Sequence, residues 1–397
     1  MRIGMFVDMY KPYLSGVTNY VSLYKRRFEE LGHEVYVFAF GERDYDDGEP
    51  NVIRSAGVPF GATGWQAGVA FSAEAKRLIP TLDIAHVHHP FLSGRLLLQE
   101  SGRLRIPVVF TGHSRYDLYS DTYASYIPRR IRYWYLRRYL DRFCRACDLV
   151  IVPSPTIQRW YREFGVTAPS TLLSNAVDTV PFRRPPRPKG KAELGFQEDT
   201  IVLVYLGRVS AEKNVGVLID AFSRAARSSD GLRLLLVGDG AAAQEASSAL
   251  AAVGLSGRAF FAGRVPYEQV PDFCAAGDVF VSASVSEVHP LVVMEAMAAG
   301  MPAIGVESPG VVDVVDDGET GLLVPAGSAD LAGSLAERMT LLARDADMRE
   351  RLAARAVEVA TERYDIRRTA EEMLGHYERL IGRPARPAPA GKARREP

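Results

Sequence analysis

Two glutamates lie eight residues apart in the segment SEVHPLVVMEAMAAG (286–300), and they carry the clearest chemical signal in the sequence. Glu287 is predicted in a loop after the apolar stretch VFVS, and Glu295 in a helix that ends at Gly300. Pro290 suits the first helical position, because its φ is fixed and its missing N–H is harmless there. The start of that helix offers free N–H groups and a positive dipole end, which suit a diphosphate. A nucleotide sugar fits this arrangement, with one carboxylate on sugar hydroxyls and the other on the ribose.

Two cations follow the predicted strand 201–207, in the sequence YLGRVSAEKN. Arg208 comes directly after this strand and Lys213 lies five residues later, so both are expected near the carboxyl end of a buried strand. In an open parallel sheet, ligands bind beyond that end. An isolated pair of cations would usually be solvated surface charge. The position of this pair beside a predicted diphosphate site favours a binding role instead.

The two motifs, S-x-x-E…E-A-M-A-A-G-x-P and G-R-x4-K, resemble those of the "glycosyl transferases group 1" family. Its members are retaining, nucleotide-sugar-dependent glycosyltransferases with the GT-B fold. The resemblance implies that Arg208 and Lys213 neutralise the donor diphosphate and help UDP or GDP to leave. It also implies that Glu287 orients the sugar and Glu295 holds the ribose, with no divalent metal and no other cofactor.

Two residues of the first half of the chain are expected at the donor through the same resemblance. Gly16, in LSGVTNY, would let the backbone approach the diphosphate, because a Cβ would obstruct it. The family commonly has two glycines at this point, whereas this chain has Ser15-Gly16. His113 ends the predicted strand 107–113 and resembles the family histidine that contacts the donor sugar near its hydroxymethyl group.

Gly238 and Gly240 have two possible interpretations. With Ala243 they fit G-x-G-x-x-A after a strand, which is the dinucleotide-binding fingerprint. That fingerprint also requires an acidic residue at the end of the next strand to bind ribose, and the next strand region, LSGRAFFAGR, has none. A nicotinamide dehydrogenase is therefore disfavoured. In the family that the chain resembles, a V-G-x-G turn at this place lies close to the donor nucleotide.

The loop between the two glutamates departs from the family pattern. The family usually reads E-G-F-G here, with small residues and free amides around the sugar, whereas this chain reads EVHP. Pro290 cannot donate a hydrogen bond, and Val288 and His289 are bulky. The donor sugar therefore stays open. His289 is expected to be an unusual sugar or phosphate contact, beside the helix-start residues Leu291 and Val292.

The elements that would position these residues form two series of alternating strands and helices. Strands of the first series are predicted at 3–8, 34–40, 83–89, 107–113 and 148–154, and those of the second at 201–207, 232–238, 259–263, 278–282, 302–306 and 321–325. The expected fold class is α/β, GT-B, with two Rossmann-like, doubly wound parallel-sheet domains facing a cleft.

The domain boundaries follow from the same pattern. An N-terminal acceptor domain is expected at 1–183 and a nucleotide-sugar-binding domain at 184–365, with the Pro- and Arg-rich stretch 175–200 as the connection. A helix at 366–382 is expected to cross back to the first domain. The Pro/Ala/Arg-rich tail 383–397 is expected to be disordered.

Composition narrows the classes of partner and compartment. With 397 residues, 47% hydrophobic and 24% charged, the chain is an ordinary globular protein with room for two domains. Its formal net charge is zero, so no bulk field attracts nucleic acid, and no nucleic-acid partner is expected. We find neither a signal peptide nor a span long enough to cross a membrane. The protein is expected in the cytoplasm, free or peripheral at the inner face of the membrane.

Cysteine and histidine clusters could suggest metal or redox chemistry. Cys144 and Cys147 form a CxxC in a helical pattern, but no second CxxC or histidine pair lies nearby, and structural zinc needs four ligands. Alternation along a strand puts His86 and His88 on one face and His89 on the other, so we expect packing or acceptor contacts. No metal site is predicted.

A basic, aromatic stretch follows His113. Between residues 115 and 145 there are eight Arg, three Asp and eight Tyr or Trp. A helix over 129–145 would place Leu136, Tyr139, Leu140 and Phe143 on one face and, mainly opposite, Arg130, Arg137, Arg138, Arg142 and Arg145. Such a helix suits the headgroup region of an anionic membrane. An ordinary helix packing its apolar face on the sheet would show the same pattern.

The acceptor expectation combines that stretch with a second resemblance. HVHHPFLSG and TGHSRYDLYSDTY resemble bacterial glycosyltransferases that glucosylate diacylglycerol. The expected function is transfer of a hexose, glucose from UDP-glucose, to a hydroxyl of a membrane lipid such as diacylglycerol. Two alternatives stay open: a soluble GDP-mannose-dependent mannosyltransferase of the same family, and a non-catalytic nucleotide-sugar-binding protein.

Overall fold

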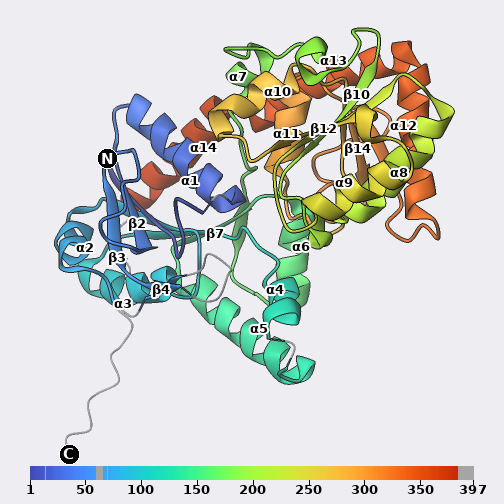
Figure 1. The fold of residues 1–397 in the computed structure, drawn as a ribbon. Helices are drawn as coiled ribbons and strands as arrows, with labels where there is room; N and C mark the ends of the chain where they lie inside the picture. The colour runs from blue at the N-terminus through green and yellow to red at the C-terminus, as the bar shows by residue number, and fades with distance from the viewer. Residues whose placement is uncertain (14, 60–65, 69, 125, 383–397) are drawn as a thin grey trace, which may run out of the picture. The chain divides into compact units, whose positions relative to one another are not determined.

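The computed structural model describes residues 1–13, 15–59, 66–68, 70–124 and 126–382, and Figure 1 shows its fold. The chain divides into two compact units. Unit 1 comprises Met1–Ser174 and the segment from Arg367 onward, and unit 2 comprises Asn175–Ile366. Each unit has its own parallel sheet. The predicted tail 383–397 lies outside the described residues.

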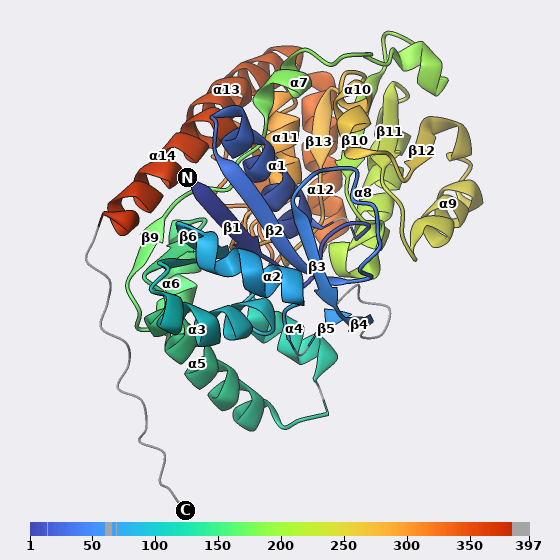
Figure 2. The same cartoon turned by 90° about the vertical axis from the view of Figure 1, so that its left-hand side faces the viewer.

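Unit 1 has a seven-stranded sheet in the order β3-β2-β1-β6-β7-β8-β9, and all of its neighbours are parallel. Figure 2 shows β1, β2 and β3 side by side. The strands are β1 (Arg2–Phe6), β2 (Glu34–Gly41), β3 (Val52–Ala56), β6 (Ile84–Val87), β7 (Val108–Thr111), β8 (Leu149–Val152) and β9 (Ser170–Leu172). A separate antiparallel pair joins β4 (Val58–Pro59) to β5 (Gln66–Ala67).

Unit 2 has a six-stranded parallel sheet in the order β12-β11-β10-β13-β14-β15. Its strands are β10 (Ile201–Leu206), β11 (Leu232–Val237), β12 (Ala259–Gly263), β13 (Val279–Val281), β14 (Ala303–Val306) and β15 (Gly321–Val324). Successive residues of β10 belong alternately to two buried clusters: Leu203 packs in one and Val204 in the other. Both faces of the sheet are therefore covered, which is why its strands read as nearly continuous apolar runs.

Helices cover both faces of the unit 2 sheet. One cluster includes side chains of α8 (Val215–Ser228), α9 (Ala243–Ala252) and α12 (Leu331–Arg344). The other includes side chains of α7 (Thr179–Arg183), α10 (Val270–Cys274), α11 (Leu291–Ala298) and α13 (Ala346–Tyr364).

Unit 1 carries α1 (Gly16–Glu30), α2 (Ala73–Leu78), α3 (Ser93–Leu104), α4 (Tyr116–Tyr123), α5 (Arg129–Ala146) and α6 (Pro155–Phe164). From Arg367 onward, α14 (Ile366–Ile381) also belongs to unit 1. Phe28 of α1 and Tyr377 of α14 hold their ring centroids 5.8 Å apart, so the first and last helices of the chain lie side by side (Figure 1).

All the predicted strands are present, with ends that differ by one or two residues at most. The prediction missed β3 and β9, because a short strand containing Arg54 and a three-residue edge strand leave little apolar pattern. The predicted connection 175–200 instead packs into unit 2, where Phe182, Leu194 and Phe196 are buried in the core. Because the segment is rich in proline and arginine, these three apolar side chains form no periodic pattern that would predict their burial.

One further prediction about local structure was wrong. Pro290 precedes α11 rather than opening it, since its ψ of 117° is extended and helical geometry begins at Leu291.

Within the described ranges, no helix combines the length and the apolar character that crossing a membrane requires.

Candidate active site

The sheet of unit 2 reverses its direction of growth between β10 and β13. From β10 the chain proceeds outward through β11 and β12, and then returns to place β13 on the other side of β10. Leu203 pairs with Val279 and Val204 with Phe280, so the two carboxyl ends are adjacent. The loops that follow separate at this switch point, where open α/β sheets bind their ligands.

Lys213 and Glu287 come from these two loops and meet. The Lys213 Nζ lies 2.7 Å from Glu287 Oε1, and both side chains are largely buried. The neighbouring Asn214 donates its side-chain amide to the carbonyl of Ala283 at 3.1 Å, which ties the loops together a second time. Two predicted site residues that are 74 positions apart in sequence therefore form one ion pair.

Arg208 is not brought into this pair. Its side chain is 66% exposed and forms an ion pair with Glu212 on the same loop. Its backbone carbonyl accepts a hydrogen bond of 2.7 Å from the Tyr205 hydroxyl, which anchors the start of the loop. The predicted contact of its guanidinium with a diphosphate stays a prediction.

The Glu287 loop is held by residues that the sequence did not single out. The N–H of Gly310 donates to the Glu287 carbonyl at 3.1 Å, and a Cβ on Gly310 would lie 2.4 Å from the carbonyl carbon of Val288. On another side, Asn175 donates its amide to the His289 carbonyl at 3.0 Å. A glycine and an asparagine in loops give no pattern that marks such contacts in advance.

Glu295 lies on α11, the helix that follows this loop. Its side chain is only 3% exposed, and Oε1 accepts a hydrogen bond of 2.9 Å from the Tyr267 hydroxyl. Burial raises the pKa of Glu295 to about 7, and the hydrogen bond from Tyr267 opposes that rise. A carboxyl group near its pKa at neutral pH can both donate and accept hydrogen bonds.

The side chain of His289 is also buried and packs against the ring of Tyr364, with centroids 6.0 Å apart. Burial lowers the pKa of His289 to about 3, so the imidazole is neutral at physiological pH. This position gives the bulky residue a packing role in the loop. Contact of His289 with a donor, like that of the half-buried Leu291 and Val292, stays a prediction.

Gly238 and Gly240 allow two loops to approach closely. A Cβ on Gly238, whose φ is +144°, would lie 1.8 Å from the carbonyl oxygen of Gly207. A Cβ on Gly240 would lie 2.3 Å from the carbonyl oxygen of Val209. The glycine turn after β11 therefore packs on the loop that carries Arg208, and this contact is sufficient to require both glycines.

Unit 1 has its own switch point, between β1 and β6. Asp8, just after β1, is fully buried, and its carboxylate accepts the Ser93 N–H at 2.7 Å. Its own N–H donates to His89 Nδ1 at 3.1 Å.

Gly16 opens α1 at the end of the same loop, and Ser15 caps the helix by accepting the Thr18 N–H. This cap gives Ser15 a physical role where the family commonly has a second glycine.

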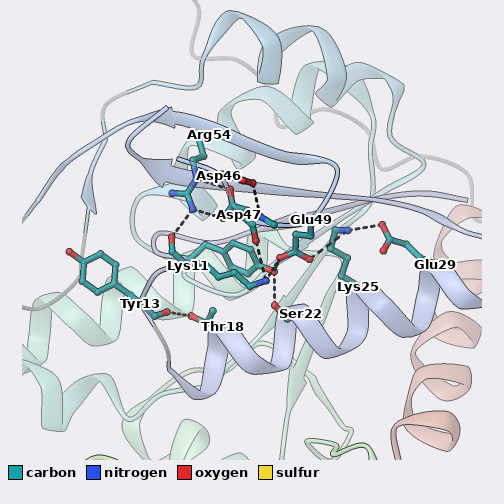
Figure 3. A network of polar contacts seen from close by, with 12 residues as sticks. Lys11, Tyr13, Thr18, Ser22, Lys25, Glu29, Asp46, Asp47, Glu49 and Arg54 are labelled. Atoms are coloured by element: carbon teal, nitrogen blue, oxygen red, sulfur yellow. Dashed lines mark hydrogen bonds and ion pairs between the residues drawn. The ribbon is translucent and has the colours of Figure 1, made fainter. Parts of the chain in front are cut away.

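A buried polar network braces the loop before Gly16 (Figure 3). Arg54 forms an ion pair with Asp47, both nearly inaccessible to water, and donates to the Lys11 carbonyl at 2.6 Å. The Lys11 ammonium in turn lies 2.8 Å from Glu49. Acidic side chains of the loop after β2 therefore point inward onto the loop that carries Gly16.

His113 follows β7, the neighbour of β6, and its half-buried ring packs edge-on against Tyr20 of α1 at 4.7 Å. Its Nε2 lies 3.0 Å from Nδ1 of the fully buried His88. Burial, with smaller contributions from His89 and His86, holds the pKa of His113 well below its usual range. The imidazole is therefore a neutral hydrogen-bonding group.

Comparison with known families decides the identity. Residues 14–180 match the family described as "Glycosyltransferase Family 4", and residues 186–359 match "Glycosyl transferases group 1". The chain belongs to the group 1 glycosyltransferases. It is 28% identical over 383 residues to the alpha-monoglucosyldiacylglycerol synthase of Streptococcus pneumoniae, an alignment that covers 92% of this chain and 83% of that protein.

A second relative has a different donor in its name. The GDP-mannose-dependent alpha-mannosyltransferase of Mycobacterium tuberculosis is 27% identical over 403 residues, covering 96% of this chain and 98% of that protein. Among solved structures, Anabaena HepE in complex with UDP and glucose superposes with a TM-score of 0.74 at 19% identity, covering 96% and 100% of the two chains. This group 1 glycosyltransferase therefore has the GT-B fold.

The groups that could take part in metal or thiol chemistry can be located in this glycosyltransferase. Among the described residues, no three histidine, cysteine, aspartate or glutamate side chains are grouped so that they could hold a metal ion. Cys144 and Cys147 are thiols buried at the end of α5, and burial raises the pKa of Cys144 to about 12. A thiol with so high a pKa is a poor nucleophile at neutral pH.

The raised pKa of Glu295 predicts a specific dependence of stability on pH. Between about pH 4.5 and 7 the folded protein retains a proton on Glu295 that the unfolded chain releases. The contribution of Glu295 to stability is therefore greatest below about pH 4.5 and is lost as the pH rises through 7. Glu295→Gln stays neutral throughout. From pH 5 to 8 we expect the wild type to lose about 2–3 kcal/mol more unfolding free energy than Glu295→Gln.

Urea unfolding at the two pH values measures this difference. Glu245→Gln, which neutralises an exposed carboxylate on α9, is the control and should follow the wild-type dependence. Parallel curves for the wild type and Glu295→Gln would show that Glu295 is ionised in the folded protein at all these pH values.

Proposed function

We propose that this protein is a retaining glycosyltransferase that transfers glucose from UDP-glucose to a hydroxyl of a membrane lipid such as diacylglycerol. The observation that carries the proposal is the Lys213–Glu287 pair, which joins a cation and a carboxylate at the switch point of a sheet in a group 1 glycosyltransferase. A nucleotide sugar needs both charges, since its diphosphate requires a cation and its sugar hydroxyls require an acceptor. A non-catalytic binding protein needs no such pair.

The proposed reaction breaks the bond between the sugar C1 and the diphosphate oxygen. Negative charge then develops on the departing diphosphate, where Lys213, Arg208 and the N-terminal amides of α11 stabilise it. The acceptor oxygen bonds to C1 on the face from which the diphosphate leaves, and its proton passes to the leaving phosphate. Glu287 orients the sugar through its hydroxyls, and Glu295 holds the ribose. In this scheme no protein side chain is a covalent nucleophile.

A donor-by-acceptor screen tests the function. UDP-glucose and GDP-mannose are each combined with diacylglycerol vesicles or with water alone, and transfer and hydrolysis are scored separately. We expect UDP-glucose with diacylglycerol to give a glycolipid, in EDTA as well as without it, because the cations and helix terminus neutralise the diphosphate. Absence of both transfer and hydrolysis with either donor would favour a binding protein.

Lys213 is expected to act mainly on turnover. Lys213→Met removes a cation whose contribution grows as charge develops on the diphosphate, so the barrier should rise by roughly 2–4 kcal/mol. Lys191→Met is the matched control, since Lys191 forms a comparable 2.8 Å pair with Asp278, beside the amino end of β13. Steady-state kinetics should show a loss of kcat for Lys213→Met and an unchanged kcat for Lys191→Met. A change confined to donor affinity would contradict the assigned role.

The acceptor proposal depends on α5, whose predicted apolar face is not available to lipid. Leu136, Leu140 and Phe143 are buried, and Phe143 packs edge-on against Phe110 of β7 at 5.1 Å. The helix therefore packs against the sheet domain, as an ordinary helix of this fold would. If α5 binds a membrane, it uses its other face.

That outer face carries large apolar side chains. Ile131, Trp134 and Tyr135 are 58%, 60% and 61% exposed. At 100° per residue they fall in the same sector as the exposed Arg138 and Arg142, opposite the buried stripe. Aromatic side chains with arginines one or two turns further on are typical of helices that lie in the headgroup region. We therefore propose that the protein binds peripherally, at the inner face of an anionic membrane, through this surface.

Vesicle co-sedimentation tests this surface. Replacing Ile131, Trp134 and Tyr135 together by Ser should abolish binding to anionic vesicles and lower lipid glycosylation, while donor hydrolysis persists. Arg138→Gln with Arg142→Gln should weaken binding by about 1 kcal/mol each, and added salt should act in the same way.

The control is an equal number of exposed valines in unit 2, Val180, Val253 and Val312, each replaced by Ser. These variants should sediment like the wild type. If the wild type itself stays in the supernatant at low salt, the lipid acceptor loses its physical support. The GDP-mannose-dependent enzyme is then the better proposal, because a relative of that name aligns over nearly the whole chain.

A further inference from the structure

The three histidines at the end of β6 have no part in the proposed reaction so far. His89 turns toward the loop after β1, where it accepts the Asp8 N–H. His86 and His88 share the other face of the strand, with ring centroids 4.2 Å apart. The Nδ1 and Nε2 of His86 are hydrogen-bonded to Tyr377 of α14 and to Thr111 of β7. His86 and His89 thus have structural partners on both sides of the strand.

His88 differs, because its partner is a predicted site residue. Its Nδ1 lies 3.0 Å from His113 Nε2, and the two ring planes are inclined by 27° with centroids 5.2 Å apart. Tyr20 of α1 contacts both rings, at 5.5 Å and 4.7 Å. His88 is completely buried, whereas His113 is half-buried. The hydrogen bond therefore joins an interior imidazole to one that reaches the surface of the unit.

We propose that His88 is a positioning residue that engages Nε2 of His113, so that His113 contacts the sugar substrate through Nδ1. The proposal rests on the proposed function, because it concerns the substrate contact of His113. A neutral imidazole has one donor and one acceptor nitrogen. Once Nε2 is hydrogen-bonded to His88, Nδ1 is the nitrogen of His113 that remains for a ligand. Whether Nδ1 donates or accepts depends on which of the two rings carries the shared proton.

The surroundings of His88 make it suited to this task. Burial, with contributions from its neighbouring histidines, holds the pKa of His88 well below its usual range, as it does for His113. Both rings are therefore neutral near pH 7. A hydrogen bond between two imidazoles requires at least one neutral ring, because only a neutral ring has an acceptor nitrogen. The ring of Tyr20 packs edge-on against that of His88, and the ring of His86 lies beside it at a tilt of 38°.

Nitrogen-15 NMR of the wild-type protein with labelled histidine tests the hydrogen bond directly. We expect a scalar coupling across the bond between His88 Nδ1 and His113 Nε2, because one proton is shared by these two nitrogens. This measurement needs no substitution and does not depend on activity. Absence of the coupling, with both nitrogens of His113 titrating as in a free imidazole, would overturn the proposal.

Two substitutions of His113 test which nitrogen meets the substrate. The amide of Asn lies close to the position of Nδ1, and that of Gln close to the position of Nε2. His113→Asn should therefore retain more of the wild-type kcat/KM than His113→Gln, although only the latter keeps a group facing His88. The reverse order would assign the substrate contact to Nε2 and reject the proposal.

Substitution of His88 tests the positioning role. His88→Leu should lower kcat/KM by up to about 100-fold, as misplaced substrate-orienting groups do, and His88→Asn, with an amide at the Nδ1 position, should restore much of it. His86→Leu is the matched control, because His86 is a buried histidine on the same face of the strand whose hydrogen bonds go to Tyr377 and Thr111. It should lower the melting temperature without the loss of kcat/KM.

The two levels of the proposal fail separately. A wild type that shows the coupling but transfers no sugar would contradict the proposed function and leave the hydrogen bond standing. A wild type that transfers sugar while His88→Leu is fully active would contradict the positioning role alone. Melting temperatures of all variants separate a loss of folding from a loss of orientation.

Discussion

The adjacency of two parallel strands, β10 and β13, is the constraint on which the rest of unit 2 depends. Because neighbouring parallel strands end at the same edge of a sheet, the loops after them begin side by side. Lys213 and Glu287 meet for this reason. The contact survives because other groups hold the two loops in place: Asn214 bridges them, and Gly310 presses against the Glu287 backbone. The ion pair and the supporting backbone contacts together hold the two loops against each other.

The two units present different chemistry at their switch points. In unit 2 a lysine and a glutamate, both largely buried, form an ion pair. In unit 1, the histidines at the ends of β6 and β7 are desolvated and their pKa values are lowered, so they act as neutral donors and acceptors. A cation suits a diphosphate, whose negative charge grows during the reaction, while a carboxylate and neutral imidazoles suit sugar hydroxyls. The proposed reaction uses each kind where its physical properties are appropriate.

Helix α5 shows how one amphipathic pattern can serve two surfaces. Its buried stripe is sufficient to explain why the helix packs on the unit 1 sheet, and it needs no membrane. The exposed Trp134 and Tyr135 are not explained by that packing, since large aromatic side chains gain nothing from contact with water. The membrane proposal therefore depends on the face that the fold leaves uncovered, and not on the amphipathic character of the helix as a whole.

The sequence by itself determined the fold class, the order of the main strands and the two loops that carry Lys213 and Glu287. These features depend on local information: apolar runs that end in turns, and charged residues placed directly after them. Short elements such as β3 and β9, and the membership of 175–200 in unit 2, depend on a few contacts with distant segments and left no comparable pattern.

Tertiary structure alone decided how each functional side chain is solvated and held. The burial that raises the pKa of Glu295, and the interior position of His289, come from helices and loops far away in sequence. The same holds for the pairing of His88 with His113, which requires two strands to lie in register. Spacing along a chain can indicate which residues share a loop, but desolvation and hydrogen bonding depend on neighbours that only the folded chain supplies.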